Sequence, residues 1–407
     1  MSFSSLNLVA PLLQTLTQLG YHQPTPIQQQ AIPLILQGQD ILASAQTGTG
    51  KTAAFALPII QQLLEQSAAK APRALILVPT RELARQVQDN MEAFTQHTAL
   101  RSVVVYGGAC LSTQSRELKT GADILIATPG RLLDYLRQGV VHLRDVRFLV
   151  FDEADRMLDM GFRDEIRDVV RQVSTERQTL LFSATLSDDI HRMAGKMLRS
   201  PQRIDISNNS TPIERIEQRV YVVDQERKLG LLAHLLQTES WPQVLVFSRT
   251  REGCDKVATW LQQQSIAARP MHAELSQAVR DKALADFAAG EVRVLVATDV
   301  AARGLDIAQL ACVINLELPF SAQDYVHRIG RTGRAGHSGL AISLYNDADQ
   351  RLLTAIEDLL DTRLPQQWYP GFEPDLTREV APARRRGSDK QRARQLALGK
   401  AGGRKKR

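Results

Sequence analysis

The chain has 407 residues, of which 43% are hydrophobic and 23% charged; this is typical of soluble globular proteins and too long for a single ordinary core. No apolar stretch approaches the ~18 residues that span a membrane, and no Lys or Arg precedes the apolar part of the N-terminus, so we expect neither a membrane helix nor a signal peptide. The three cysteines lie far apart, which argues against a disulfide framework or a zinc site and favours a reducing, cytoplasmic environment.

Positive charge is concentrated at the C-terminal end. The formal net charge of the whole chain is +6. Residues 384–407 contain 11 Lys and Arg against one acid, Asp389, whereas residues 1–383 contain 39 Lys and Arg against 43 Asp and Glu. A nucleic-acid site on the body of the protein must therefore be a local patch. The tail either solvates the chain or tethers nucleic acid without reading its sequence.

Short apolar runs alternate with segments of helical periodicity, such as Glu82–Phe94 and Glu252–Gln264. Many of the runs are apolar without alternation, as in a parallel sheet that is covered on both faces. The pattern predicts two consecutive α/β domains with parallel sheets. The expected strands are Ile41–Ala43, Ala74–Val78, Val103–Tyr106, Ile124–Ala127, Phe148–Phe151, Leu180–Phe182, Val220–Val223, Val244–Phe247, Val292–Ala297, Cys312–Leu316 and Ala341–Tyr345.

Composition indicates where the domains end. A polar cluster with a proline, 208–212, follows the last strand of the first half and is typical of a linker. The strand pattern stops after Leu364, and the residues from Arg384 onward are charged and poor in apolar side chains, which indicates disorder. We expect a first domain at 1–207, a linker at 208–217, a second domain at 218–365 and a basic, disordered tail at 366–407.

A glycine-rich loop, Gly48-Thr49-Gly50-Lys51-Thr52, follows the first strand and precedes a helical run. In this context backbone N–H groups can surround phosphate oxygens, Lys51 can contact the β- and γ-phosphates, and the Thr52 hydroxyl can ligate Mg²⁺. Ala45 stands where the general P-loop pattern has its first glycine. The alternative is an ordinary glycine turn with a chance Lys-Thr pair.

An acidic pair follows a later strand. Asp152 and Glu153 come directly after Phe148–Phe151. Ligands of open α/β sheets bind at the carboxyl ends of the strands, so this pair and the glycine-rich loop are expected at one edge. Asp152 is placed to give a second magnesium contact, and Glu153 to orient an attacking water or accept its proton. The alternative is two surface acids after a strand.

These segments belong to a larger set of strings, and together the set resembles the DEAD-box ATP-dependent RNA helicases over residues 1 to about 365. The opening Met1-Ser-Phe, the short body and the basic tail are most similar to the bacterial RhlE-type subgroup. The matching strings are Gly20-Tyr21 with Pro24-Thr-Pro-Ile-Gln28, Ala45-Gln-Thr-Gly-Thr-Gly-Lys-Thr52, Pro79-Thr-Arg-Glu-Leu83, Gly107-Gly108, Thr128-Pro-Gly-Arg131, Asp152-Glu-Ala-Asp155, Ser183-Ala-Thr185, Val246-Phe-Ser248, Ala297-Thr-Asp299 with Arg303-Gly-Leu-Asp306, and His327-Arg-Ile-Gly-Arg-Thr-Gly-Arg334.

The resemblance implies two tandem RecA-like domains of the P-loop NTPase class, helicase superfamily 2. It implies an RNA-dependent ATPase that uses ATP and Mg²⁺ and separates RNA duplexes locally and non-processively. The implied catalytic residues are Lys51, Asp152, Glu153, Arg331 and Arg334, with Mg²⁺ held by Thr52 and Asp152. The implied nucleotide-binding residues are Phe3, Tyr21, Gln28, Ala45, Gln46, Thr47, Gly48, Thr49, Gly50, Lys51, Thr52, Gly304 and Asp306.

Two further sets are implied by the same resemblance. RNA-backbone contacts are expected from Thr80, Arg81, Gly108, Thr128, Arg131, Arg280 and Thr298. Coupling between hydrolysis and unwinding is expected from Ser183, Thr185, Asp299 and His327. Ala273 follows His272 where the family usually has glycine, which puts the local backbone contact in doubt. Read without the family, Gln28 could equally lie on a helix surface.

Other functions stay open at this stage. The chain could be an RNA-clamping scaffold with little turnover, although the set of charged residues at the expected catalytic positions argues against it. It could also be a DNA translocase, because spacing does not reveal contacts to the 2′-hydroxyl. Ribosome assembly, RNA turnover and association with complexes of either process are expectations of the family alone.

Overall fold

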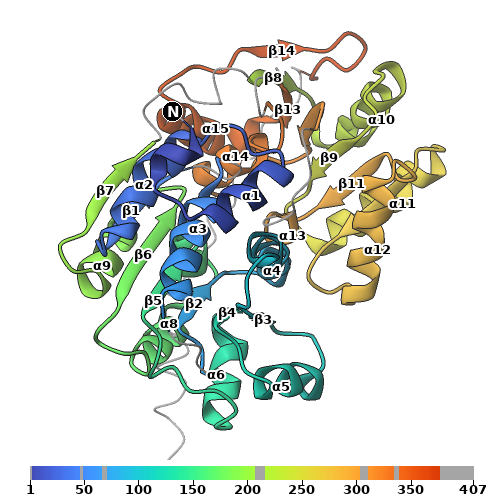
Figure 1. Ribbon diagram of the computed structural model, residues 1–407. Helices are drawn as coiled ribbons and strands as arrows, with labels where there is room; N and C mark the ends of the chain where they lie inside the picture. Colours follow the sequence, from blue (N-terminus) through green and yellow to red (C-terminus); the bar gives the residue numbers. More distant parts are fainter. Residues whose placement is uncertain are drawn as a thin grey trace, which may run out of the picture.

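The structure is a computed structural model, and it describes residues 2–45, 49–66, 71–206, 216–302, 310–333 and 339–375. Within these residues the chain forms two lobes, each built on a parallel sheet of seven strands (Figure 1). The predicted fold class, two consecutive α/β domains, is confirmed. The strands are β1 (Ile41–Ser44), β2 (Ala74–Leu77), β3 (Ser102–Val105), β4 (Ile124–Ala127), β5 (Phe148–Phe151), β6 (Gln178–Ser183), β7 (Gln202–Asp205), β8 (Ile216–Val222), β9 (Val244–Phe247), β10 (Ala268–Met271), β11 (Val294–Ala297), β12 (Cys312–Asn315), β13 (Gly339–Tyr345) and β14 (Gln366–Trp368).

The two sheets have the same topology. The strand order is β3-β4-β2-β5-β6-β1-β7 in the N-terminal lobe and β10-β11-β9-β12-β13-β8-β14 in the C-terminal lobe. Each strand of the second sheet thus takes the place of the strand seven positions earlier in the first. The carboxyl ends of all strands in a sheet lie at one edge because every pair is parallel.

Helices cover both faces of each sheet. One face of the first sheet packs against α2, α3 and α4, and the other against α6, α8 and α9. The helices of the N-terminal lobe are η1 (Phe3–Leu6), α1 (Ala10–Gln18), α2 (Pro26–Leu36), α3 (Lys51–Leu64), α4 (Arg81–Thr95), α5 (Leu111–Lys119), α6 (Pro129–Arg137), α7 (Ala154–Asp159), α8 (Arg163–Val170) and α9 (Asp188–Met197). Those of the C-terminal lobe are η3 (Gln225–Arg227), α10 (Lys228–Thr238), α11 (Arg251–Gln263), α12 (Gln277–Ala288), α13 (Asp299–Ala302), α14 (Ala322–Ile329), η4 (Asp347–Asp349) and α15 (Gln350–Leu360).

Several helices begin at a side-chain cap. The hydroxyls of Thr80, Ser187, Thr250 and Ser276 each accept a hydrogen bond from the backbone N–H three residues later, at the starts of α4, α9, α11 and α12. Such caps satisfy N–H groups that have no partner inside the helix.

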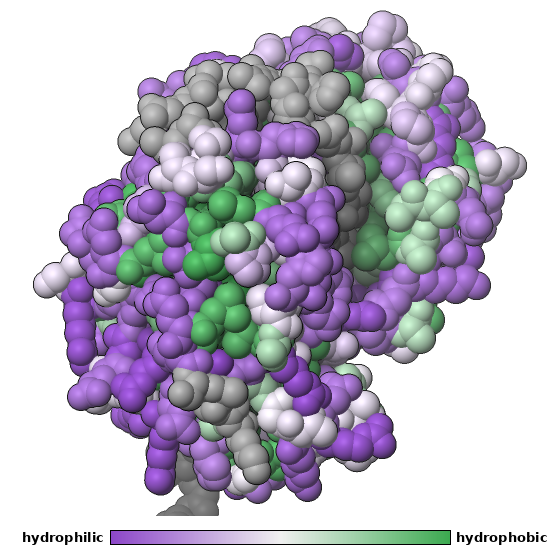
Figure 2. Space-filling model, viewed as in Figure 1, coloured by the Kyte–Doolittle hydropathy of each residue, from purple (hydrophilic) through white to green (hydrophobic). Residues whose placement is uncertain are grey.

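Figure 2 shows polar side chains over most of one face of the molecule, with apolar residues among them.

Every predicted strand is present, but the sequence missed β7, β10 and β14. These are three of the four outermost strands of the two sheets. Half of the residues of β7 and all three of β14 are exposed, and β10 contains Pro270. An edge strand is not covered on both faces and can accommodate proline, so it lacks the continuous apolar run that marks a central strand.

The C-terminal lobe extends beyond the predicted boundaries, which is a correction. Strand β8 begins at Ile216, inside the segment expected to be a linker, and β14 pairs with it in residues expected to belong to the tail. Tyr369 then packs edge to face with His234 of α10, and Phe372 packs against the same ring at a tilt. Residues 366–375 are therefore part of the lobe; residues 207–215 and 376–407 lie outside the described ranges. In the part of the chain that the structure describes, every helix is too short or too polar to cross a membrane.

Candidate active site

The end of β1 leads into the glycine-rich loop, of which Gln46, Thr47 and Gly48 lie outside the described residues. Gly50 has a positive φ of 88° and immediately precedes α3, with Lys51 in the first turn and Thr52 next to it. The Lys51 side chain is buried, and its Nζ donates to the carbonyl of Ala45 at 3.0 Å. The helix N-terminus and the ammonium group therefore give this edge of the sheet a positive potential suited to phosphate.

Gln28 is a buried residue of α2 that contacts this loop. Its Oε1 accepts from the Thr25 N–H at 2.9 Å, and its Nε2 donates to the Gly50 carbonyl at 3.1 Å. A Cβ at Gly50 would lie 2.4 Å from Nε2, so only glycine fits there. Gln28 is 1% exposed, so the alternative of a surface glutamine is wrong.

Two of the expected nucleotide-binding residues lie together on the N-terminal segment. The rings of Phe3 and Tyr21 meet edge to face with centroids 6.4 Å apart, and Tyr21 meets Phe94 in the same way at 6.1 Å. Phe3 is buried, whereas Tyr21 keeps 36% of its surface exposed. Tyr21 therefore keeps exposed surface that a ligand ring could contact, while Phe3 packs against its ring.

The acidic pair follows β5 and is buried, so the alternative of two surface acids is wrong. Asp152 is 2% exposed and Glu153 is 5% exposed. Burial raises the pKa of Asp152 to about 6, although the charge of Lys51 opposes the shift. Burial also acts to raise the pKa of Glu153, but the charges of Arg156, Lys51 and Arg331 outweigh it and hold that pKa at about 2. Among the described residues, Asp152 Oδ1 has no hydrogen-bond partner.

The third acid of the string holds the end of the neighbouring strand. Asp155 Oδ2 accepts from the N–H of Ala184 at 3.0 Å and from both the N–H and the hydroxyl of Thr185, at 2.9 and 3.1 Å. Ser183 lies at the end of β6 with its hydroxyl buried, and no described residue bonds to that hydroxyl. Of the two residues expected to couple hydrolysis to unwinding, Thr185 is thus hydrogen-bonded to the acidic string, whereas the Ser183 hydroxyl is not.

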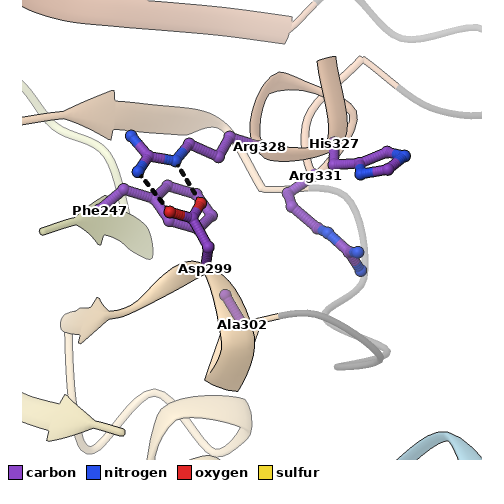
Figure 3. A pocket seen from close by; sticks show the side chains of 6 residues that line it. All are labelled: Phe247, Asp299, Ala302, His327, Arg328 and Arg331. Atoms are coloured by element: carbon purple, nitrogen blue, oxygen red, sulfur yellow. Dashed lines mark hydrogen bonds and ion pairs between the residues drawn. The ribbon is translucent and has the colours of Figure 1, made fainter. Parts of the chain in front are cut away.

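In the C-terminal lobe a small, partly open pocket lies between the end of β9, α13 and α14. Asp299 and Arg328 form a two-point ion pair on one side of it, at 2.6 and 2.8 Å, whereas His327 and Arg331 lie on the other side (Figure 3). Arg331 is one of the charges that lower the pKa of Glu153, so its side chain acts across the boundary between the lobes. Arg334, Gly304 and Asp306 lie outside the described residues.

The expected RNA contacts of the N-terminal lobe lie at the other half of the same sheet edge, after β2, β3 and β4. Thr80 caps α4, and Thr128 precedes α6. Gly108 has a φ of 84°, and a Cβ on it would lie 2.4 Å from Arg81 Nη1, so these two residues are in close contact. Arg131 is held internally, since its Nη1 donates to Gln114 Oε1 at 3.0 Å and to the Ala109 carbonyl.

Two ion pairs join α4 of one lobe to α12 of the other. Arg280, expected to contact RNA, lies 2.5 Å from Glu82 and is mostly buried. Arg85 lies 2.9 Å from Asp281, and both side chains are about half exposed. Thr298 precedes α13 at the end of β11, and its N–H donates to the carbonyl of Met271, the last residue of β10, which leads to α12. The helix that begins at Arg81 and the helix that carries Arg280 are thus joined directly by ion pairs.

Three residues of this site were not singled out from the sequence. Arg328 pairs with Asp299, Arg156 pairs with Glu153, and Glu82 pairs with Arg280. Each stands inside or beside a string that was recognised, but an Arg or Glu in a helical turn is usually a solvated residue. Only the burial of the side chain distinguishes these three, and burial here depends on contacts between distant segments.

Comparison with known proteins gives consistent matches over most of the chain. The sequence model of the DEAD/DEAH box helicases matches residues 25–193, and that of the helicase conserved C-terminal domain matches residues 227–336. The DEAD-box ATP-dependent RNA helicase RhpA of Helicobacter pylori is 40% identical over 363 residues, which cover 89% of this chain and 73% of the relative. The DEAD-box ATP-dependent RNA helicase CshA of Bacillus subtilis is 38% identical over 375 residues, covering 92% and 76%.

Solved structures match the same two lobes. Dbp5 of S. cerevisiae bound to RNA and ADP BeF3 has a TM-score of 0.81 at 28% identity, over 98% of this chain and 99% of that one. Mss116p bound to ssRNA and AMP-PNP has a TM-score of 0.83 at 28% identity, over 91% and 80%. The matched residues contain the glycine-rich loop, the acidic string and the arginine-bearing helix α14. The chain therefore belongs to the family of DEAD-box ATP-dependent RNA helicases.

Proposed function

We propose that this chain is an RNA-dependent ATPase that uses ATP to separate RNA duplexes, with a reaction site completed by both lobes. The observation that carries the proposal is the position of Arg331, whose charge acts on Glu153 although the two residues belong to different lobes. Relatives of this chain are named ATP-dependent RNA helicases, and the similar structures hold RNA with a nucleotide analogue. Hydrolysis then depends on closure of the lobes, which RNA and ATP favour together.

In the proposed site, the loop at 45–52 and the start of α3 hold the phosphates, and Gln28 with Tyr21 and Phe3 receives the adenine. During hydrolysis a water oxygen bonds to the γ-phosphorus while the bond from that phosphorus to the bridging oxygen breaks, releasing ADP and phosphate. Glu153 orients this water or accepts its proton, and Arg331 stabilises charge on the transferring group. Arg334, Gly304 and Asp306 are proposed from the sequence alone.

The residues present fit a magnesium ion bound with the nucleotide. Asp152 Oδ1 is buried and has no partner among the described residues, and an orphan carboxylate oxygen of this kind is what a hard cation binds. No group of three or more His, Cys, Asp or Glu in the described ranges could hold a metal by itself, so the remaining ligands would come from Thr52, phosphate and water. The ion would neutralise phosphate charge and so lower the barrier to transfer.

We propose that RNA binds along the other half of the sheet edges. The residues are Thr80, Arg81, Gly108, Thr128 and Arg131 in the N-terminal lobe and Arg280 and Thr298 in the C-terminal lobe. Hydroxyls, arginines and backbone N–H groups bind phosphates without reading sequence. Because each stacked pair lost costs ~1–2 kcal/mol, only a few pairs open for each ATP, and the activity is local rather than processive.

Finer assignments are also proposals. The opening Met1-Ser-Phe and the basic tail favour the RhlE-type subgroup, and the family favours a role in ribosome assembly or RNA turnover. The described cysteines Cys110, Cys254 and Cys312 are all unpaired, which favours a cytoplasmic location. Ser183, Thr185, Asp299 and His327 are proposed to couple hydrolysis to strand separation.

The test compares ATP hydrolysis by the full chain without nucleic acid, with single-stranded RNA and with single-stranded DNA. We expect strong stimulation by RNA, little by DNA, and at least a hundredfold loss of the stimulated rate in Lys51→Ala, because one phosphate contact of this kind is worth ~10²–10³ in rate. Slow turnover with tight RNA binding would favour a scaffold, and equal stimulation by DNA would favour a translocase. RNAs crosslinked in cells to Glu153→Gln would identify the target.

A further inference from the structure

A buried arginine lies within the acidic string, and the roles proposed above do not use it. Arg156 is 4% exposed, and its Nη1 donates to Glu153 Oε2 at close range. Within the described residues, its Nε and Nη2 have no hydrogen-bond partner. A buried guanidinium with donors unsatisfied is costly, so its presence calls for a reason beyond stability.

The backbone around the ion pair is fixed on both sides. Glu153 has a left-handed φ of 54°, a conformation that a non-glycine residue adopts only when its surroundings enforce it. Asp155 Oδ1 accepts from the Arg156 N–H at 2.9 Å, and Asp155 Oδ2 holds residues 184 and 185. The first turn of α7 is therefore tied to the end of β6, and Arg156 starts from a fixed position.

A chain of contacts thus runs from the end of β6 to the carboxylate of Glu153. It passes from Thr185 to Asp155, then along one peptide to Arg156, and across the ion pair to Glu153. A carboxylate with one oxygen held by a fixed guanidinium cannot rotate freely about its terminal torsion. Water orientation requires a carboxylate in one defined position, because a displacement of about 1 Å can cost on the order of 10² in rate.

We propose that Arg156 is a positioning residue for hydrolysis, which holds the Glu153 carboxylate in the orientation that the attacking water needs. This inference rests on the proposed role of Glu153. Arg156 itself touches neither substrate nor reacting atoms in this assignment. Removing it should slow the chemical step while leaving ATP affinity nearly unchanged, because the phosphate contacts of Lys51 and the loop remain.

The experiment measures RNA-stimulated ATP hydrolysis by the full chain and its variants. In Arg156→Met we expect kcat to fall ~10- to 100-fold with KM for ATP within about twofold. Arg156→Lys keeps a charge at the site and should recover most of the loss. Arg167 lies on the exposed side of the next helix, and Arg167→Met serves as the matched control with an unchanged rate. Melting temperatures and binding of a fluorescent ATP analogue show whether each variant is folded.

The decisive comparison places the substitution in a Glu153→Gln background, studied in single turnovers. If Arg156 acts through Glu153, adding Arg156→Met there should change the rate less than about twofold, because the ion pair no longer exists. An equal loss in both backgrounds, or an unchanged kcat in Arg156→Met alone, would overturn the proposal. A Glu153→Gln variant with full activity would instead reject the proposed role of Glu153, which separates the two failures.

Discussion

The two lobes share one topology, yet the buried charges at the equivalent sheet edges are paired differently. Lys51 begins α3 after β1, and Lys228 begins α10 after β8, the strand in the corresponding position. In the N-terminal lobe Lys51 faces an acidic pair of which one oxygen, Asp152 Oδ1, has no partner in the described residues. In the C-terminal lobe Lys228 is paired with Asp349 at 3.3 Å, and Asp349 also takes Arg249 at 2.6 Å.

The charged side chains at the sheet edge of the C-terminal lobe are therefore paired with one another. Glu317 follows β12 as Asp152 follows β5, but its Oε2 accepts from the hydroxyl of Ser248 and the N–H of Arg249. Burial lowers the pKa of Lys228, and Asp349 opposes the shift. The comparison teaches that the scaffold alone does not make a nucleotide site: an edge is available to a ligand when its buried charges lack partners within the protein.

The largest expected effect tests whether the C-terminal lobe contributes charge to the reaction. Arg331→Ala should lower RNA-stimulated kcat by about 10³-fold, as loss of an arginine finger does, while ATP binding to the N-terminal lobe changes little. Steady-state hydrolysis and analogue binding measure the two quantities. Arg351→Ala, at an exposed position of α15, is the control and should match the parent chain. A rate within tenfold of the parent would mean that the N-terminal lobe holds a complete site.

The second prediction concerns the internally paired edge. Asp349→Ala leaves Lys228 buried without a partner, so the C-terminal lobe should lose about 3–5 kcal/mol of stability. All three tryptophans, Trp241, Trp260 and Trp368, lie in this lobe, so tryptophan fluorescence during urea unfolding reports on it alone. Lys228→Met removes the charge and leaves Asp349 paired with Arg249, so it should cost less. The exposed Asp358→Ala is the control; equal losses in all three variants would contradict the comparison.

The third prediction concerns the edge that is open to ligand. Because the pKa of Asp152 is raised to about 6, the fold loses stability as pH rises from about 4 to 6, where the unfolded chain has already released this proton. Asp152→Asn should therefore stabilise the nucleotide-free N-terminal lobe by roughly 1–3 kcal/mol at pH 7.5, although it impairs hydrolysis. The gain should shrink at pH 5. Urea unfolding followed by circular dichroism measures this change in stability, and the tryptophan signal separates it from unfolding of the C-terminal lobe. A variant that is less stable than the parent at pH 7.5 would contradict a buried, unpaired carboxylate.

The smallest effect is expected at the contact between the lobes. Arg85 and Asp281 are both about half exposed, so their ion pair should contribute only about 0.5 kcal/mol. Arg85→Gln, Asp281→Asn and the double variant form a cycle in which the RNA concentration for half-maximal hydrolysis rises about twofold in each, without adding in the double variant. The difference should vanish in high salt. Additive effects would show that the two residues do not interact when RNA binds.

The sequence by itself determined the central strands, because a strand covered on both faces must be a continuous apolar run, as at Leu75 and Val246. It also determined which residues follow those strands, and hence that the glycine-rich loop and the acidic pair share one edge. It could not locate β7, β10 and β14, since an edge strand needs no such run. Nor could it place the end of the C-terminal lobe, because Tyr369 and Phe372 gain their partners only from α10.

Only the tertiary structure decided which buried charged side chains have partners in the protein and which, like Asp152, keep an oxygen without one among the described residues. Glu82 and Arg280 meet although 198 positions separate them, and Lys228 meets Asp349 across 121. The local sequence pattern indicates helical or strand periodicity and turns, which depend on residues a few positions apart. Burial and pairing of a charge depend on segments brought together by folding, and these two quantities set whether an arginine or carboxylate stabilises the protein or serves its reaction.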